Sequence, residues 1–226
     1  MADDLIAKSD SDSPVPEIHL RWVADAQLRF SAAIEGLDDD AVRAPSLLPG
    51  WSVGHVLTHV ARNADSHIRR SEAAVRGEVV EQYPGGYAGR ASDIERGARR
   101  PPAAIIEDVA ATSASLQSVW GTLRGAAWTM QVRDVSGRHH VLRAMPSRRW
   151  RELEIHLVDL DIGPSYDDWP EEFVAENLPE LRRTLDGRLQ DNARPAEPGE
   201  LSGREELAWL CGRLHRPGLA DLLPWG

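Results

Sequence analysis

The sequence predicts a mainly α-helical fold built on an antiparallel four-helix bundle. Four long segments carry apolar residues at helical spacing, and Gly, Pro and Ser residues that favour caps and turns stand between them. One shorter segment changes to a strand-like pattern, which indicates a small β-hairpin. The interior of such a bundle is where facing side chains commonly build metal sites. The four helical segments are residues 17–36, 53–76, 91–124 and 147–162.

The first half of the chain carries clear signals for where its helices begin and end. Residues 17–36 place apolar side chains roughly in helical phase, and the run from Asp38 to Asp40 then supplies caps for a short turn. Ser52 is a good N-cap for the helix over 53–76. The turn-rich loop Tyr83-Pro84-Gly85-Gly86-Tyr87 follows that helix.

The second half adds a helix, a hairpin and another helix. Residues 91–124 contain at least one long helix, which is entered near Pro101. Residues 128–144 predict a hairpin that turns around Ser136-Gly137. The helix over 147–162 is followed at once by glycine and proline, a common way for a helix to end.

The C-terminal region is expected to be a short appendage to the bundle. Residues 170–190 are predicted to be helical, residues 191–203 to form a polar Pro/Gly-rich loop, and residues 204–214 to form a last short helix. The expected divisions of the chain are a disordered arm at 1–16, the helical bundle at 17–165 and a shortened C-terminal region at 166–226.

Composition limits the classes of partner. The net charge of −10 and the pI near 5.3 argue against binding to nucleic acid or to an anionic membrane. The apolar runs are far shorter than a membrane span, and residues 1–16 lack the apolar core of a secretory signal. Cys211, the only cysteine, is interpreted as a small buried hydrophobic residue and not a nucleophile. We therefore expect a cytoplasmic protein that is a monomer or a weak homodimer.

Three residues from two of the predicted helices are candidate metal ligands: His59, Glu152 and His156. Glu152 and His156 are four residues apart, so they point the same way on a helix. His59 lies on the flank of the apolar stripe of its own helix, whereas His55 lies close to the opposite side. Two imidazoles and one carboxylate would leave the fourth position of Zn²⁺, or of another divalent metal, open for water or substrate.

Other interpretations of these residues stay open at this point. A Glu–His pair at this spacing is often only a solvated pair, and His55 with His59 could form a metal pair of its own. Asp159 could hold His156 through its second ring nitrogen, or it could be a surface charge. Trp51 is interpreted as a core anchor at the start of its helix.

Motifs around these residues resemble a known family. Similarity to the mycothiol-dependent maleylpyruvate isomerases covers roughly residues 20–165 and includes several motifs in the same order. The resemblance implies a DinB-like four-helix bundle whose metal ligands fall on His59, Glu152 and His156. The motifs are Leu48-Pro49-Gly50-Trp51-Ser52 through His59 to Asp65, Tyr83-Pro84-Gly85-Gly86, Asp93 to Ala98, and Arg149-Trp150-Arg151-Glu152 through His156 to Leu160.

The same family ends in a small α/β domain whose last helix carries a Trp-Leu-x-Gly-Arg element. This element appears here as Trp209-Leu210-Cys211-Gly212-Arg213. The resemblance implies that Arg213 is a catalytic residue, and we expect residues 204–226 to bring it to the mouth of the metal site; a surface arginine is the alternative. Because residues 191–203 contain almost no β-branched side chains, the sheet that precedes this element in the family is expected to be truncated or absent.

The implied function is that of a metal- and thiol-dependent enzyme. A Zn²⁺-bound mycothiol thiolate would add to the double bond of maleylpyruvate, allow rotation and leave again, giving fumarylpyruvate. Arg213 and Arg90 are the candidates for holding anionic groups, and Arg90 is assigned to cosubstrate binding. A mycothiol S-transferase or a biosynthetic thiol-transfer enzyme would use the same thiolate. A non-catalytic metal-binding bundle and a metal-dependent hydrolase are the alternatives from other classes.

Overall fold

The computed structural model of the chain describes residues 15–189 and 201–223. These residues form two compact units, of which the first ends at His156 and the second begins at Leu157. The fold is mainly helical with one two-stranded antiparallel sheet, so the predicted fold class is confirmed. The arm expected at 1–16 and the loop expected at 191–203 lie largely outside the described residues.

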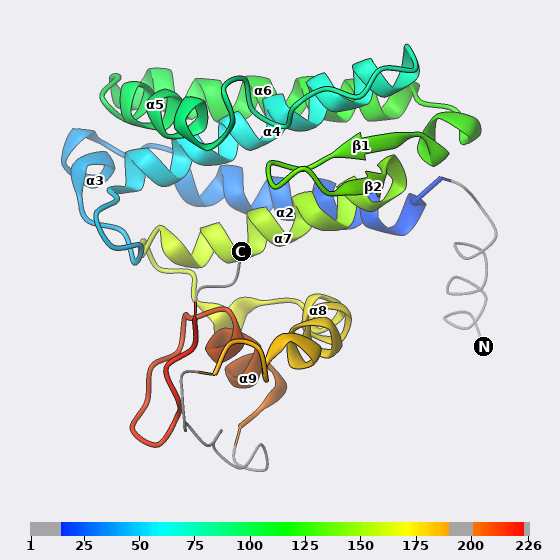
Figure 1. Cartoon of the computed structure of the whole chain (residues 1–226). Coiled ribbons are helices and arrows are strands. Elements are labelled where there is room, and N and C mark those ends of the chain that lie inside the picture. Colours follow the sequence, from blue (N-terminus) through cyan, green and yellow to red (C-terminus); the bar gives the residue numbers. More distant parts are fainter. Residues whose placement is uncertain (1–14, 190–200, 224–226) are drawn as a thin grey trace. The chain divides into compact units, whose positions relative to one another are not determined.

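The first unit is built around four long helices, with shorter elements beside them (Figure 1). Helix α4 packs against α6, and α2 also contacts α6. Helix α7 joins α2 through a stacked pair of indoles, Trp22 and Trp150, whose ring centroids lie 4.5 Å apart. No helix in the described part of the chain is long and apolar enough to cross a membrane. The four helices are α2 (Glu17–Ile34), α4 (Val53–Val75), α6 (Pro102–Thr122) and α7 (Met145–Asp159).

Helix α4 begins where the sequence predicted, at the Ser52 cap. Ser52 forms a capping box with His55, whose Nδ1 lies 2.8 Å from the Ser52 hydroxyl and accepts the Ser52 backbone N–H at 3.2 Å. The short helix α3 (Asp39–Arg43) is capped in a related way, because the Asp38 carboxylate accepts the Ala41 N–H at 2.9 Å. The aspartate run therefore starts α3, and Ser52 starts α4.

Helix α5 (Gly86–Ala98) was missed, because its glycine-rich start was predicted to be a loop. Gly85 precedes α5 in the left-handed region of backbone conformation, at φ 74°. Because glycine has a low helix propensity, the glycine-rich sequence of α5 does not show a helical pattern. A Cβ at Gly97 would lie 2.3 Å from the Thr58 side chain, so glycine here lets α5 approach α4 closely. This contact is made between α5 and the turn of α4 that carries His59.

The predicted hairpin is confirmed. Strand β1 (Gln131–Arg133) pairs antiparallel with β2 (His139–Val141), and Val132 lies opposite His140. Asp134 holds the turn, because one of its carboxylate oxygens accepts the backbone N–H groups of Ser136 and Arg138, each at 3.0 Å. The 3-10 turns η1 (Gly125–Thr129) and η2 (Leu142–Ala144) connect the hairpin to α6 and α7.

The second unit is built on two helices, α8 (Glu171–Thr184) and α9 (Gly203–Leu210), with the short turn η3 (Tyr166–Asp168) before them. Arg182 and Glu206 join α8 to α9 through two parallel contacts of 2.6 and 2.5 Å. In the described residues of this unit, β pairing is limited to an isolated antiparallel bridge between Leu189 and Leu222.

A buried arginine crosses the core of the first unit. Arg149, on α7, is 1% exposed and donates to the Val60 carbonyl at 2.8 Å and to the Asn63 amide oxygen at 2.9 Å, both on α4. It also reaches Gln27 on α2 and Ser113 on α6, each at 3.4 Å. Burial lowers the pKa of Arg149 to about 10, which leaves it cationic at neutral pH. One guanidinium therefore ties all four helices together.

We predict that replacing Arg149 destabilises the bundle strongly. Arg149→Ala would leave the Val60 carbonyl and the Asn63 amide buried without their donor, at a cost of about 3 kcal/mol or more in the free energy of unfolding. Arg149→Lys should give an intermediate loss, because a single ammonium cannot span acceptors on three helices. Urea denaturation measures both, with the exposed neighbour Arg148→Ala as the control. A loss for Arg149→Ala no larger than that of the control would contradict the assignment.

Candidate metal centre

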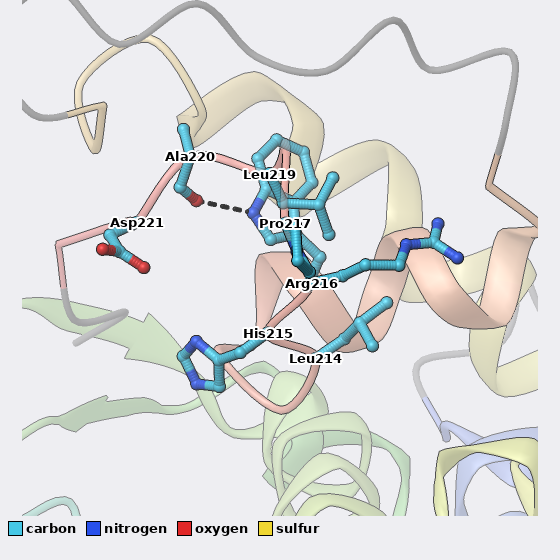
Figure 2. A pocket seen from close by; sticks show the side chains of 8 residues that line it. Leu214, His215, Arg216, Pro217, Leu219, Ala220 and Asp221 are labelled. Carbon is cyan, nitrogen blue, oxygen red and sulfur yellow. Dashed lines mark hydrogen bonds between the residues drawn. The ribbon is translucent and has the colours of Figure 1, made fainter.

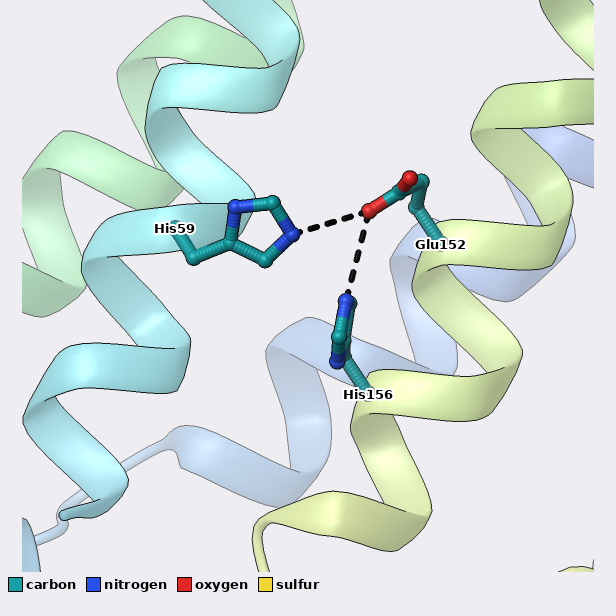
Figure 3. A group of neighbouring side chains, drawn as sticks. All are labelled: His59, Glu152 and His156. Atoms are coloured by element: carbon teal, nitrogen blue, oxygen red, sulfur yellow. Dashed lines mark hydrogen bonds and ion pairs between the residues drawn. The ribbon is translucent and has the colours of Figure 1, made fainter. Parts of the chain in front are cut away.

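Three side chains meet between α4 and α7 in the first unit (Figure 3). His59 comes from the second turn of α4, and Glu152 and His156 come from successive turns of α7. A single carboxylate oxygen, Glu152 Oε2, lies 3.0 Å from His59 Nε2 and 3.3 Å from His156 Nε2. The two imidazole rings are perpendicular, with centroids 4.7 Å apart. The structure thus brings together the three residues that the sequence selected.

This spacing fits a tetrahedral metal. Bonds of about 2.0–2.1 Å at tetrahedral angles place neighbouring ligand atoms roughly 3.3–3.4 Å apart. The ligand atoms of His59, Glu152 and His156 all lie within 4.8 Å of one another, and the two closest pairs are at 3.0 and 3.3 Å. Two imidazoles and one carboxylate are also a donor set that suits Zn²⁺. A divalent ion could enter with only small side-chain shifts.

The protonation states of His59 and Glu152 favour binding of a cation. Burial lowers the pKa of His59 to about 4, although the hydrogen bond to Glu152 acts in the opposite direction. Burial would raise the pKa of Glu152, but hydrogen bonds from His156 and His59 outweigh it and hold this pKa well below its usual range. At neutral pH, His59 is neutral and Glu152 is ionised, the forms that bind a metal.

The cluster is closed on one side and open on the other. His59 is 3% exposed, and the Trp51 indole packs against its ring at a centroid distance of 5.8 Å and an interplanar angle of 63°. The Glu152 side chain is 33% exposed, which leaves an approach for a small ligand. Trp51 is itself only half-buried, so its interpretation as a core anchor is wrong: it stands at the rim of the site.

Arg90, from α5, lies beside the cluster. Its guanidinium is 3.2 Å from His59 Nδ1 and sits over two aromatic rings, Trp51 at 5.8 Å and Tyr83 at 5.7 Å. Sequence reasoning did not single out Tyr83, although it belongs to one of the motifs. The sequence signal for Arg90 was the resemblance alone, because α5 itself was not predicted. A cation next to a metal site can attract an anionic group of a ligand.

His55 does not join the cluster. Its Nδ1 is engaged by the Ser52 cap, and its Nε2 lies 3.3 Å from Glu95. The alternative in which His55 and His59 form a metal pair is therefore wrong: the capping interaction turns the His55 ring toward the start of α4.

Arg213 and Asp159 pair with each other in the second unit. Arg213 Nε and one terminal nitrogen donate to the two oxygens of Asp159 at 2.8 and 2.7 Å. The Asp159 side chain is 0% exposed and that of Arg213 is 16% exposed, so neither is a surface charge. Cys211 is buried nearby in the chain, and its carbonyl accepts a further Arg213 N–H. The catalytic role expected of Arg213 stays a prediction.

The second unit also contains a cavity of about 270 Å³ near its C-terminal segment (Figure 2). The Trp209 indole N–H donates to the Ala220 carbonyl at 2.8 Å across one wall, and His215 and Asp221 line another part. None of the three candidate metal ligands lines this cavity.

We predict that the cluster binds one divalent metal ion per chain. His59→Ala and His156→Ala should each lose most of the bound zinc, because two remaining ligands hold the ion far more weakly. His55→Ala is the matched control and should keep a wild-type zinc content, since His55 serves the helix cap. Elemental analysis after dialysis measures all three. Wild-type zinc content in both ligand variants would refute the assignment.

Comparison with known proteins identifies the family. A search of curated proteins found no match. The fold matches the crystal structure of the mycothiol-dependent maleylpyruvate isomerase with a TM-score of 0.81 and 21% sequence identity, over 93% of this chain and 97% of that chain. The crystal structure of a histidine-to-alanine mutant of that enzyme also matches over 93% of this chain and 97% of that chain, with a TM-score of 0.82 and 21% identity.

The part of the chain that matches a known sequence family includes the candidate metal centre. The family described as the mycothiol maleylpyruvate isomerase N-terminal domain matches residues 23–161, a range that contains His59, Glu152 and His156. The match spans well over half of the chain. The chain therefore belongs to the mycothiol maleylpyruvate isomerase N-terminal domain family.

Proposed function

We propose that this protein is a metal- and mycothiol-dependent enzyme that isomerises maleylpyruvate or a closely related cis-unsaturated keto acid. The observation that carries the proposal is the three-ligand cluster, whose atoms are spaced for a tetrahedral ion and which is open at Glu152. Family membership supports the choice of thiol and reaction.

The protein's own residues have distinct parts in this proposal. His59, Glu152 and His156 would hold the metal, which would lower the pKa of a thiol placed in its open position. Trp51 stands at the rim of the site, with its ring centroid 5.8 Å from that of His59. Arg90 offers a guanidinium held between two aromatic rings, suited to orient a carboxylate of the substrate.

The reaction needs no other reagent. Addition of a thiol sulfur to the conjugated double bond makes that bond single and moves an electron pair onto the neighbouring carbonyl. Rotation about the single bond and loss of the thiol restore the double bond in the trans form. The thiol is returned unchanged, and no net oxidation occurs. The single cysteine of the chain, Cys211, is buried and takes no part.

Activity assays separate this proposal from its alternatives. Zinc-loaded protein with mycothiol and maleylpyruvate should give fumarylpyruvate, followed by NMR, without net consumption of thiol. Glu152→Gln should abolish this turnover, because it removes the charged ligand shared by both histidines. Stoichiometric thiol consumption with an electrophile would instead indicate a mycothiol S-transferase. Turnover of a substrate without added thiol would indicate a hydrolase and would contradict the proposal.

We predict that Arg90 binds the substrate carboxylate. Arg90→Ala should raise the KM for maleylpyruvate about tenfold or more, the loss expected for a hydrogen bond to a charged group. Zinc content should stay at the wild-type level, because Arg90 is not a ligand. Arg96→Ala, an exposed position on the same helix, is the matched control. An unchanged KM in Arg90→Ala at full zinc occupancy would remove Arg90 from substrate binding.

A further inference from the structure

A second cavity of about 240 Å³ lies in the first unit, between the hairpin turn and the loop that precedes α5. The loop contributes Glu81, Gln82 and Tyr83, and the hairpin contributes Arg133, Asp134 and Ser136. At roughly 30 Å³ per water molecule, the space equals about eight waters. It is therefore too large for a single bound water and about the size of one small ring with its substituents.

Tyr83 connects this hairpin cavity to the metal centre. Its side chain lines the cavity, and its ring lies 5.7 Å from the guanidinium of Arg90. Arg90 in turn lies 3.2 Å from His59 Nδ1. Gly86, at the cavity wall, is one helical turn before Arg90 on α5. Tyr83 and Arg90 thus form a chain of contacts from the cavity to His59.

The walls of the cavity are fixed by hydrogen bonds. The Gln82 amide oxygen accepts the Val135 N–H at 2.9 Å, which joins the loop to the hairpin. Arg69, from α4, donates to the backbone carbonyls of Glu81 and Gln82 and holds the loop from behind. Asp134 also accepts from the Ser136 hydroxyl, at 2.6 Å. The cavity is therefore formed before any ligand enters.

Three groups at the cavity keep free hydrogen-bonding capacity. In the described part of the chain, the side chains of Arg133, Tyr83 and Glu81 make no hydrogen bond or ion-pair contact, although Arg133 is half-buried and Tyr83 is buried. They offer the five donors of a guanidinium, one phenol hydroxyl, one carboxylate and an aromatic ring. Neighbouring hydroxyl groups on a ring can donate to the carboxylate and accept from the guanidinium at the same time.

The charge at the cavity disfavours an anion. Glu81 and Asp134 together carry more negative charge than Arg133 carries positive charge. Burial would raise the pKa of Asp134, but hydrogen bonds from Ser136, from His140 and from the Arg138 backbone outweigh it, so the pKa lies below its usual range. A neutral ligand rich in hydroxyl groups can form hydrogen bonds with both the acidic and the basic side chains of the cavity, whereas the two carboxylates would repel a carboxylate or a phosphate.

We propose that the hairpin cavity binds a neutral polyhydroxylated ring, namely the sugar-like part of the thiol cosubstrate, while the thiol end reaches the metal centre past Tyr83 and Arg90. This inference rests on the proposed function, because it takes mycothiol as the thiol. Mycothiol consists of an acetylated cysteine joined to a glucosamine, which is joined to an inositol. Its hydroxyl-bearing rings match the free groups at the cavity in chemistry, and the cavity has room for one of them.

Binding of the rings without the thiol tests the cavity directly. The probe is N-acetylglucosaminyl-inositol, titrated into zinc-loaded protein and followed by calorimetry or by ligand-observed NMR. Arg133→Ala should weaken this binding about tenfold or more, since it removes a charged donor. It should leave the hairpin intact, because Arg133 contributes only backbone groups to the pairing of β1. Gln131→Ala, an exposed position on the same strand, is the control and should bind as wild type does.

Turnover gives the second measurement. Arg133→Ala should raise the KM for mycothiol about tenfold or more and leave the rate with N-acetylcysteine, which has no sugar rings, unchanged. Equal effects on both thiols, or wild-type binding of the ring probe, would overturn the cavity assignment while the proposed function stands. Ring binding that depends on Arg133, in a protein that shows no thiol-dependent turnover, would support the cavity assignment and refute the proposed function.

Discussion

The buried guanidinium of Arg149 is the interaction on which the rest of the first unit depends. It binds the Val60 carbonyl and the Asn63 side chain, which are one and four residues beyond His59 on α4. Arg149 itself lies one turn before Glu152 on α7. These bonds therefore set the register between the two helices at the level of the candidate metal ligands. A buried cation is costly unless every donor finds an acceptor, so only a narrow range of helix positions satisfies it. That narrow range is what places His59 opposite Glu152 and His156.

The site draws on three helices whose contributions differ in kind. Helix α7 supplies two candidate ligands from adjacent turns, so their relative position follows from helix geometry alone. Helix α4 supplies the third candidate ligand in a buried position, where desolvation keeps the imidazole neutral. Helix α5 supplies Arg90, and it reaches the site because Gly97 allows it to lie close against Thr58. A side chain at Gly97 would push α5 outward and carry Arg90 away from His59.

The two units use arginine in different ways. In the first unit, Arg90 is held by aromatic faces and by one imidazole nitrogen, so its guanidinium keeps donors available for an anion. In the second unit, Arg213 is already paired bidentately with Asp159, and any anionic ligand would have to displace a fully buried carboxylate. Binding an anionic ligand to Arg213 would break two charge-assisted hydrogen bonds, whereas Arg90 could bind an anion while it still faces its aromatic rings.

The sequence by itself determined most of the helical pattern and the hairpin, because periodicity and capping are local properties, and it selected the three residues of the candidate metal cluster through helical spacing and motif resemblance. Helical periodicity, the Ser52 cap and the spacing of Glu152 and His156 are properties of a short stretch of chain. Only the tertiary structure decided the existence and placement of α5, since its glycines lower helix propensity and are required by packing against Thr58. It also decided the position of Trp51 beside His59, the pairing of Arg213 with Asp159 and the cavity at Tyr83. These features join residues that are distant in sequence, and no local pattern specifies which of them will meet.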